Sequence, residues 1–562
     1  MKIKNIYKIM AALTLPLMGV GGLTSCTDSD SELVSFVEDN RLDTPNDTVY
    51  SLLGIIGKMQ VVADRTILLG ELRGDLTSLT EQAPLDLQRI ANFEADATNP
   101  YNNARDYYAL IQNCNYFLAN ADIDLKKRGY LVFEREYAVI KTYRAWAYLQ
   151  LALNYGSVPF FTEPILKEKD AVPSKYEHYD VKQIANYFID DIKPYVDTEY
   201  PDYGSIGGLA SRRFYIPVRV LLGDLCLWAE RYDEAAKYYH DFLTLQSAPR
   251  PVGSASIGWG NREFESIRDE YASQFTSNSE ILTIIPMETR EYDGVISRLN
   301  DVFNSTEKNN YYYQATHSPA YDALSRSQRY VGLFMDPVNQ LPDTLLPEDM
   351  GKVYEEEAQR GDLRQYSVYP PLRTVISSSS NYSTLRQTCN KYRSDHVTLY
   401  RLQYVYLRYA EALNRAGYPE SAFTILKYGL WKDNIEKYIS EQEREKAGNL
   451  LTFSEYNFTR ENTIGLHARG CGNTECDTLY VIPECASLED SIQSVEDLIC
   501  DEMALETAAE GVRYYDLMRI AQHRNDPTFL ARKVAGRKGA ANFDDALFNK
   551  LSSTKNWYLP LE

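Results

Sequence analysis

Tyrosine is the residue type of this sequence best suited to recognition chemistry. The 562 residues include 45 tyrosines, whose rings combine a flat apolar face with a polar tip at low rotamer cost. Such rings suit polar, ring-shaped ligands when planar amide, carboxylate or guanidinium groups lie beside them to bond hydroxyls. The densest group is Asn309-Asn310-Tyr311-Tyr312-Tyr313, and Trp259 lies in a glycine-rich stretch. We expect Trp259, Tyr311, Tyr312 and Tyr313 to bind ligand; the structural alternative is that the tyrosine run covers a core edge or a partner.

Motifs of several enzyme classes are missing from the sequence. It contains no Gly-x-Ser-x-Gly elbow, His-Glu-x-x-His helix, Gly-Lys-Ser/Thr phosphate loop or Gly-x-Gly-x-x-Gly fingerprint. The six histidines are scattered, with no two at metal-ligand spacing on a helix. We therefore predict a protein that is not an enzyme, with no catalytic residue, metal or cofactor. A carboxylate pair for glycoside hydrolysis stays open, because its separation is a property of the fold.

The cysteine count limits the disulfide chemistry. One of the eight cysteines, Cys26, belongs to the N-terminal signal described below, and the remaining seven cannot all pair within one chain. Cys471, Cys476 and Cys485 lie close together in sequence. Three interpretations remain open for them: one disulfide, a zinc site with His467 as a further ligand, or isolated buried thiols.

The N-terminus has the order of a bacterial export signal. Lys2, Lys4 and Lys8 precede an apolar run from Ile9 to Leu23 that is too short and glycine-rich to span a bilayer. Leu23-Thr24-Ser25-Cys26 resembles a lipobox, so we predict a signal peptide over 1–25 and lipidation of Cys26. Residues 26–40 form an acidic tether whose start resembles the export signal of Bacteroidetes surface lipoproteins. These features predict a lipid anchor in the outer membrane, facing the exterior.

The charge of the chain excludes one class of partner. Its formal net charge is −20, and such a chain repels polyanions, whereas nucleic-acid binding needs a basic surface. We therefore expect no nucleic-acid partner, and ligands that are neutral or cationic.

Helical patterns recur on both sides of a different middle region. Apolar residues follow a helical period from Tyr107 to Ala121 and again from Glu136 to Asn154, where Gly156 and Pro159 supply stop signals. Another pair begins near Pro217 and resumes at Tyr232. The fold class is therefore mainly α, with a single domain over 41–562. Its parts are a helical region over 41–250, a loop-rich region over 251–395 with short strands such as Glu280 to Pro286, and a helical region over 396–562.

Small residues twelve positions apart indicate tetratricopeptide-like hairpins. Gly223 and Ala235 have this spacing, and so do Ala410 and Ala422. In that repeat each small residue lets one helix approach its neighbour. Two imperfect copies favour a superhelical array of helix pairs.

Several segments resemble, in order, one family: the SusD-like (RagB-like) nutrient-binding lipoproteins of Bacteroidetes. The matching segments are Gly70-Glu71-Leu72-Arg73-Gly74-Asp75, Asn99-Pro100-Tyr101-Asn102-Asn103, Tyr107-Tyr108 with Asn113-Cys114-Asn115-Tyr116, Arg144-Ala145 with Tyr155-Gly156-Ser157-Val158-Pro159, Tyr409-Ala410-Glu411-Ala412-Leu413-Asn414, Gly465-Leu466-His467-Ala468-Arg469-Gly470, Glu510-Gly511-x-Arg513-Tyr514-x-Asp516-Leu517-x-Arg519 and Trp557-Tyr558-Leu559-Pro560. One departure is Met503, where the family usually has arginine.

The resemblance implies about four tetratricopeptide-like hairpins plus an irregular region. It also implies a lid on a SusC-like TonB-dependent transporter that captures oligosaccharide. Asn99, Tyr101 and Asn102 are ligand-binding candidates by this resemblance, with Arg73 and Asp75 nearby in sequence; the alternative for Asn-Pro-Tyr is a plain turn. Two other functions stay open. One is a peptide-binding lid of the RagA/RagB type, and the other is a tetratricopeptide adaptor that binds a protein and no nutrient.

The acidic motif residues near the C-terminus favour a structural role. Glu502, Glu506 and Glu510 are spaced four apart on one helix face, with Arg513, Asp516 and Arg519 just downstream. This spacing predicts a buried ion-pair network. Gly511 interrupts the helical pattern, and we predict that it permits close packing.

Overall fold

A computed structural model describes residues 45–245, 280–335, 342–345, 361–376, 383–455, 458–460 and 463–561. The predicted signal peptide (1–25), the tether (26–40) with Cys26, and Trp259 lie outside these residues. Within the described ranges, none of the helices combines the length and the apolar character needed to cross a bilayer.

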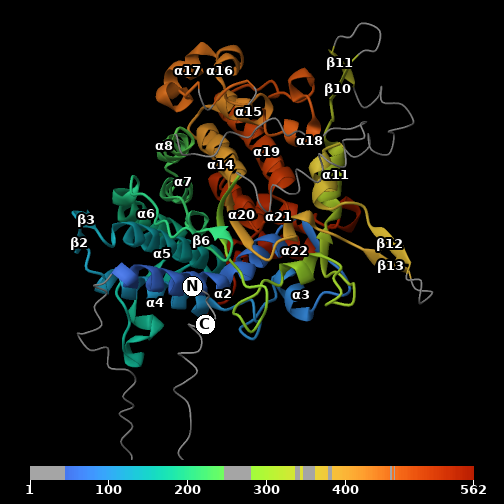
Figure 1. The fold of residues 1–562 in the computed structure, drawn as a ribbon. Helices are drawn as coiled ribbons and strands as arrows, with labels where there is room; N and C mark the ends of the chain where they lie inside the picture. The colour runs from blue at the N-terminus through green and yellow to red at the C-terminus, as the bar shows by residue number, and fades with distance from the viewer. Residues whose placement is uncertain are drawn as a thin grey trace, which may run out of the picture. The chain divides into compact units, whose positions relative to one another are not determined.

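A succession of helices, each packed on the next, forms the scaffold (Figure 1). These helices are α2 (Pro45–Leu72), α4 (Ala104–Asn120), α5 (Glu134–Tyr155), α6 (Val181–Ile192), α7 (Val218–Trp228), α8 (Tyr232–Leu243), α14 (Leu402–Arg415) and α15 (Pro419–Lys427). Consecutive helices pair as α4/α5, α7/α8 and α14/α15, and α6 packs on α5, so the predicted mainly helical fold built from helix hairpins is confirmed. Helix α5 is buried over almost all of its surface, because α2, α4, α6 and α7 surround it.

Side-chain caps and a glycine set the ends of these helices. The Asn103 side chain accepts the Arg105 N–H at the start of α4. Asp180 and Gln183 form a reciprocal capping box at the start of α6. Helix α5 stops at Gly156, whose φ of 77° is the left-handed conformation that favours glycine. The helices and the stop predicted from the apolar period are therefore confirmed to within a few residues.

The small residues of the predicted repeat lie where helices meet. An added Cβ at Gly223 in α7 would lie 2.5 Å from the Tyr239 ring of α8. Ala235, Ala410 and Ala422 have no exposed surface. The close approach that the twelve-residue spacing predicts is thus present in both hairpins.

The C-terminal helices pack back on earlier helices of the array. They are α16 (Lys432–Tyr438), α17 (Glu441–Ala447), α18 (Ala468–Cys471), α19 (Leu488–Thr507), α20 (Arg513–His523), α21 (Pro527–Ala535) and α22 (Asp545–Leu551). Helix α19 packs on α14 and α15, and α20 packs on α19 and on α2. A Cβ at Gly70 of α2 would overlap the carbonyl group of Gly511. The predicted packing role of Gly511 is confirmed.

The middle region differs in part from its prediction. Its described parts contain the expected short strands, but also the short helices α10 (Leu299–Phe303), α11 (Pro319–Ser327) and α13 (Leu363–Val368). The side chains of Ser318 and Asp362 cap α11 and α13, so local capping chemistry produces helices where apolar periodicity was too short to predict them. Helix α3 (Leu85–Ala91) follows α2.

The strands form two-stranded antiparallel pairs. The pairs are β1 (Thr77–Leu79) with β9 (Ala315–His317), β2 (Lys126–Lys127) with β3 (Tyr130–Leu131), β4 (Val158–Pro159) with β5 (His178–Tyr179), β6 (Ser205–Ile206) with β7 (Leu209–Ala210), β8 (Ile281–Ile285) with β14 (Val397–Arg401), β10 (Gly332–Met335) with β11 (Pro342–Leu345), and β12 (Arg373–Ile376) with β13 (Ser383–Arg386). The predicted strand near Glu280 to Pro286 is confirmed as β8.

A buried ion-pair network joins α19 to α13, β14 and α18. Glu506 lies 3.1 Å from Arg364, 3.3 Å from Arg401 and 3.4 Å from Arg469. Glu502 pairs with Arg364, and Glu510 pairs with Arg401. The predicted burial in ion pairs is confirmed, but the cations that pair with these glutamates come from outside the motif, while Arg513 pairs with Asp75 and Arg519 with Glu411 and Asp516.

Candidate ligand-binding site

Strand pairing brings two distant groups of predicted site residues together. Strand β1 follows the Arg73–Asp75 segment and pairs with β9, which follows the tyrosine run; Leu79 lies opposite Ala315. Beyond this pair, the Thr80 hydroxyl donates to the Tyr313 carbonyl at 2.7 Å. The tyrosine run is therefore fixed to the segment that leads into α3, and Figure 1 shows the yellow-green middle region beside α3.

The loop over 306–313 has a defined shape that presents its tyrosines. The Asn309 side chain accepts the Thr306 N–H at 2.9 Å and donates to the Asp301 carbonyl at 2.9 Å. Asn310 and Tyr311 have φ values of 55° and 65°, a conformation that costs energy for non-glycine residues. Tyr312 is 51 % exposed, and Tyr311 and Tyr313 are half-buried.

A cation stacks on this loop. The guanidinium carbon of Arg386, the last residue of β13, lies 3.3 Å from the centroid of the Tyr311 ring. This contact holds the ring of Tyr311 and places a planar donor group beside it. Aromatic faces and planar hydrogen-bonding groups thus occur together, as recognition of a sugar requires.

The Asn-Pro-Tyr segment forms a turn against the start of α3. Asn99 donates to the Asp86 carbonyl and accepts the Tyr101 N–H. Asn102 donates to the carbonyls of Asp96 and Pro560. Both asparagines are buried, so they shape the turn, while Tyr101 is half-buried.

Tyr101 lies within the electrostatic reach of two carboxylates. Burial is the main cause that raises the pKa of Tyr101, and the negative charges of Asp64 and Asp86 raise it further. Asp64, on α2, accepts the Ser297 hydroxyl at 2.7 Å and the Arg298 N–H at 2.6 Å. Burial raises the pKa of Asp64 in spite of these hydrogen bonds. Asp64 therefore links α2 to the chain segment that precedes the tyrosine loop.

Both tyrosine groups are fixed to the same short segment, residues 80–86. At its start, the Thr80 hydroxyl donates to the Tyr313 carbonyl, and at its end the Asp86 carbonyl accepts from the Asn99 side chain. We define the candidate site as Tyr101, Tyr311, Tyr312 and Tyr313 with Asp64, Arg298 and Arg386. The last three were not predicted from the sequence, and no local pattern could have identified them.

Arg73 and Asp75 are held inside the fold. Arg73 has no exposed surface; its guanidinium donates to Asn154 and to the carbonyls of Leu69 and Trp557, and it lies 4.3 Å from the Tyr514 ring centroid. Asp75 accepts two hydrogen bonds from Arg513, at 2.6 and 2.9 Å. In spite of its burial, the Arg513 charge holds the pKa of Asp75 below its usual value. These contacts tie α2 to α20 and to the chain end.

A buried group with metal-ligand chemistry is already used by the ion-pair network. The donor atoms of Asp362, His467 and Cys471 lie within 4.8 Å of one another. Arg364 donates to both Asp362 carboxylate oxygens, and His467 Nδ1 lies 2.8 Å from Glu502. A cation here would have to displace the Arg364 guanidinium, so these residues do not fit a metal.

The three clustered cysteines are free thiols with different surroundings. Cys471 is buried, and its thiol lies 3.3 Å from the Asp362 carboxylate. Cys476 is exposed, and Cys485 is half-buried. Of the open interpretations, isolated thiols describe this structure, but only Cys471 is buried as that interpretation expected.

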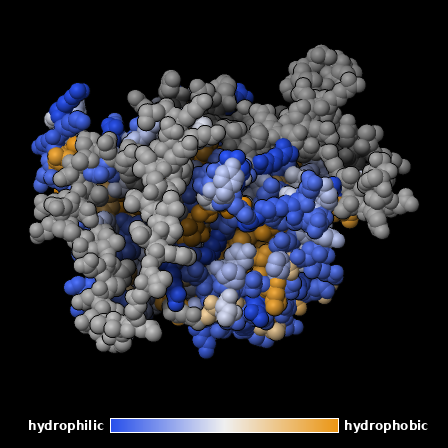
Figure 2. Space-filling view, turned by 60° about the horizontal axis from the view of Figure 1, so that its bottom comes forward, coloured by the Kyte–Doolittle hydropathy of each residue, from blue (hydrophilic) through white to orange (hydrophobic). Residues whose placement is uncertain are grey.

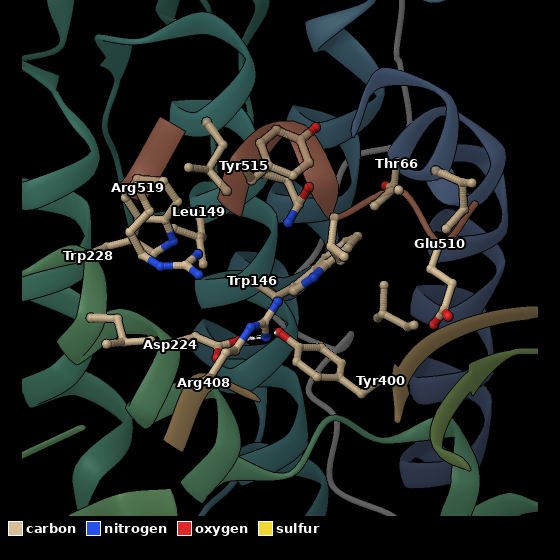
Figure 3. A pocket seen from close by; sticks show the side chains of 17 residues that line it. Thr66, Trp146, Leu149, Asp224, Trp228, Tyr400, Arg408, Glu510, Tyr515 and Arg519 are labelled. Atoms are coloured by element: carbon tan, nitrogen blue, oxygen red, sulfur yellow. Dashed lines mark hydrogen bonds and ion pairs between the residues drawn. The ribbon is translucent and has the colours of Figure 1, made fainter. Parts of the chain in front are cut away.

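An interior cavity is too small for a sugar. It has a volume of about 50 Å³ and lies among side chains of α5, α7, α14 and α20, including Trp146, Asp224, Arg408 and Arg519 (Figure 3). That volume suits one or two water molecules.

Comparisons with known proteins agree with this fold. Residues 306–561 match the model of the SusD family. A SusD homolog from Bacteroides thetaiotaomicron superposes with a TM-score of 0.56 at 15 % identity, covering 91 % of this chain and 92 % of the other. A SusD superfamily protein from Bacteroides fragilis gives 0.55 at 17 %, covering 92 % and 96 %. A SusD-like carbohydrate-binding protein from Bacteroides vulgatus gives 0.50 at 16 %, covering 85 % and 83 %. No curated protein matches the chain.

Proposed function

The chain is a member of the SusD family, and from this premise we propose that it binds an oligosaccharide nutrient at the cell surface. In this proposal Cys26 carries the lipid anchor in the outer membrane, and the body is the lid of a SusC-like TonB-dependent transporter. Ligand binding and lid closure need a difference in affinity between states and no catalytic group.

The observation that carries the proposal is the shared attachment of the two tyrosine groups. Tyr101 and the 311–313 loop both depend on residues 80–86, and charged groups capable of bonding hydroxyls lie beside them. A sugar presents C–H faces to aromatic rings and hydroxyls to planar polar groups, which is the chemistry these residues offer. The similar protein from Bacteroides vulgatus is described as carbohydrate-binding, which supports the same class of ligand here.

The adaptor alternative is less compatible with the packing. A tetratricopeptide adaptor needs an exposed helical face for its partner, but here α5 and α7 are buried over almost their whole length, and the cavity that they line with α14 and α20 is only about 50 Å³. Where Figure 2 colours the face that comes forward, most residues are hydrophilic, with a hydrophobic band near the centre. A mixed surface of this kind suits contact with both a polar ligand and a protein partner.

Calorimetry of the full-length protein against panels of glycans and peptides tests the proposal. We expect binding to at least one oligosaccharide, and about tenfold weaker binding in Tyr101→Ala and in Tyr312→Ala, since each loses an aromatic face. Tyr130→Ala is the matched control, because Tyr130 is 80 % exposed on a different element. Binding to peptides with none to sugars would replace the oligosaccharide by a peptide ligand. Equal sugar affinity in all variants would place the site elsewhere.

The anchor and the partner are tested separately. We expect mass spectrometry of the mature protein to show acylated Cys26, and affinity purification to recover a TonB-dependent barrel with it. A free thiol at Cys26 would contradict the anchor, and repeated purification without a barrel would contradict the lid.

A further inference from the structure

A basic hairpin projects from the fold between α4 and α5. Strands β2 and β3 form it, and it lies at the left edge of Figure 1. Every residue from 126 to 131 is exposed, so the hairpin contributes nothing to the core. Tyr130 is 80 % exposed, Leu131 37 % and the preceding Ile123 50 %. Figure 2 shows a hydrophilic projection with a hydrophobic patch beside it at the same edge.

The turn of this hairpin holds an arginine in a conformation that favours glycine. Arg128 and Gly129 have φ values of 52° and 87°. The hairpin of β6 and β7 makes the same kind of turn with Gly207 at 60° and Gly208 at 87°. Because glycine would remove the cost of a left-handed residue, the arginine at this tip suggests a role beyond forming the turn.

The cations of the hairpin are available to a partner. Lys126, Lys127 and Arg128 are consecutive in a chain of net charge −20, and all three are exposed. Within the part of the chain that the structure describes, no ion pair joins any of them to another residue. Asp122 and Asp124 precede the hairpin and are also exposed, so residues 122–131 carry a net charge of +1, with the three cations gathered at the turn.

We propose that this hairpin binds the surface of an anionic membrane. Three clustered cations attract headgroup phosphates, and an exposed tyrosine with two aliphatic side chains suits the interface between headgroups and acyl chains. A soluble polyanion would engage the cations but would leave Ile123, Tyr130 and Leu131 in water. The coincidence of both kinds of side chain favours a lipid surface.

The inference relies on the proposed function in one respect: the lipid anchor of Cys26 would hold the hairpin near the bilayer. A weak local attraction is then sufficient to orient the body, because the anchor makes the contact effectively intramolecular. The hairpin would restrict rotation of the body about its tether.

Trypsin provides a direct test, because the hairpin contains three cleavage sites. The full-length lipidated protein is placed in vesicles of phosphatidylcholine, with or without phosphatidylglycerol, and cleavage after residues 126–128 is followed by mass spectrometry. We expect cleavage to be about tenfold slower on the anionic vesicles. Lys432, which is also exposed, is the internal control and should be cleaved equally in both. Equal rates at the hairpin in both vesicles would overturn the proposal.

Variants separate the contribution of the apolar side chains of the hairpin from that of its cations. The double variant Tyr130→Ser/Leu131→Ser keeps all three cleavage sites but should no longer be protected by anionic vesicles. Leu479→Ser, at a leucine that is 71 % exposed, is the control and should stay protected. Protection by soluble polyphosphate equal to that by anionic vesicles would overturn the assignment to a membrane. Failure to float with neutral vesicles would contradict the anchor alone. In that case, co-sedimentation with anionic vesicles tests the hairpin. The wild type should co-sediment with the vesicles, and the double variant should not.

Discussion

At the scale of single residues, buried charge is the feature that most restricts substitution. Glu506 has no exposed surface. Although burial favours its neutral form, the charges of Arg469, Arg401 and Arg364 lower its pKa from 4.5 to about 2. Removing one partner of a buried ion pair leaves the other charge uncompensated. The resulting loss of stability is larger than the net stabilisation that the intact pair provides.

Glu506→Gln should therefore destabilise the protein by on the order of 3 kcal/mol at neutral pH. Because the folded pKa of Glu506 is lowered, its contribution is fully present above 4.5 and is lost as pH falls toward about 2. The difference in unfolding free energy between wild type and variant should thus shrink across that window. Denaturant titrations at a series of pH values measure it. A difference that stays constant through the window would contradict the lowered pKa.

At the scale of elements, the contact between α2 and the turn before α20 depends on two glycines. Gly511 has a φ of 76°, and a Cβ there would overlap Ile67 of α2, just as a Cβ at Gly70 would overlap Gly511. The two backbones approach more closely than side chains allow. This contact joins the first described helix to the C-terminal helices.

Gly70→Ala should destabilise the protein by about 3 kcal/mol, because backbone atoms must move to admit a methyl group. Gly54→Ala is its matched control in the same helix. An added Cβ at Gly54 meets nothing within 4 Å, so the variant should gain about 0.5–1 kcal/mol from helix propensity. Thermal unfolding of the two variants measures both effects. Similar shifts would mean that the α2–α20 contact relaxes without cost.

At the scale of the whole molecule, the chain end binds the scaffold. The Trp557 carbonyl accepts from Arg73, the Pro560 carbonyl accepts from Asn102, and the Leu559 N–H donates to the Asn154 carbonyl at 2.8 Å. The Trp557 side chain is buried. The last residues thus stabilise α2, the Asn-Pro-Tyr turn and the end of α5 together.

A chain that ends at Asn556 should lose stability and show faster hydrogen exchange near Arg73, Asn102 and Asn154. The physical reason is that their polar groups lose buried partners. Tyr130→Ala, at a side chain that is 80 % exposed on a different element, is the control and should change neither property. Exchange that accelerates uniformly over the molecule would indicate a global loss of stability instead of a local one.

Features that depend on local spacing could be predicted from the amino-acid sequence. The apolar period of α4 and α5, the stop at Gly156, the hairpin spacing of Gly223 and Ala235, and the row of Glu502, Glu506 and Glu510 all involve residues close in the chain. Helical period, caps and small-residue contacts are local properties, so they can be recognised without knowing the fold.

Which candidate residues reach the surface could be learned only from the folded chain. Arg73 and Asp75 lie near Tyr101 in sequence, but they are bound to Trp557 and Arg513, far along the chain. The link between Asp64 and Arg298 spans 234 residues. Contacts of this length depend on how the helices pack and close, and no local pattern encodes the partner that a buried polar group will meet.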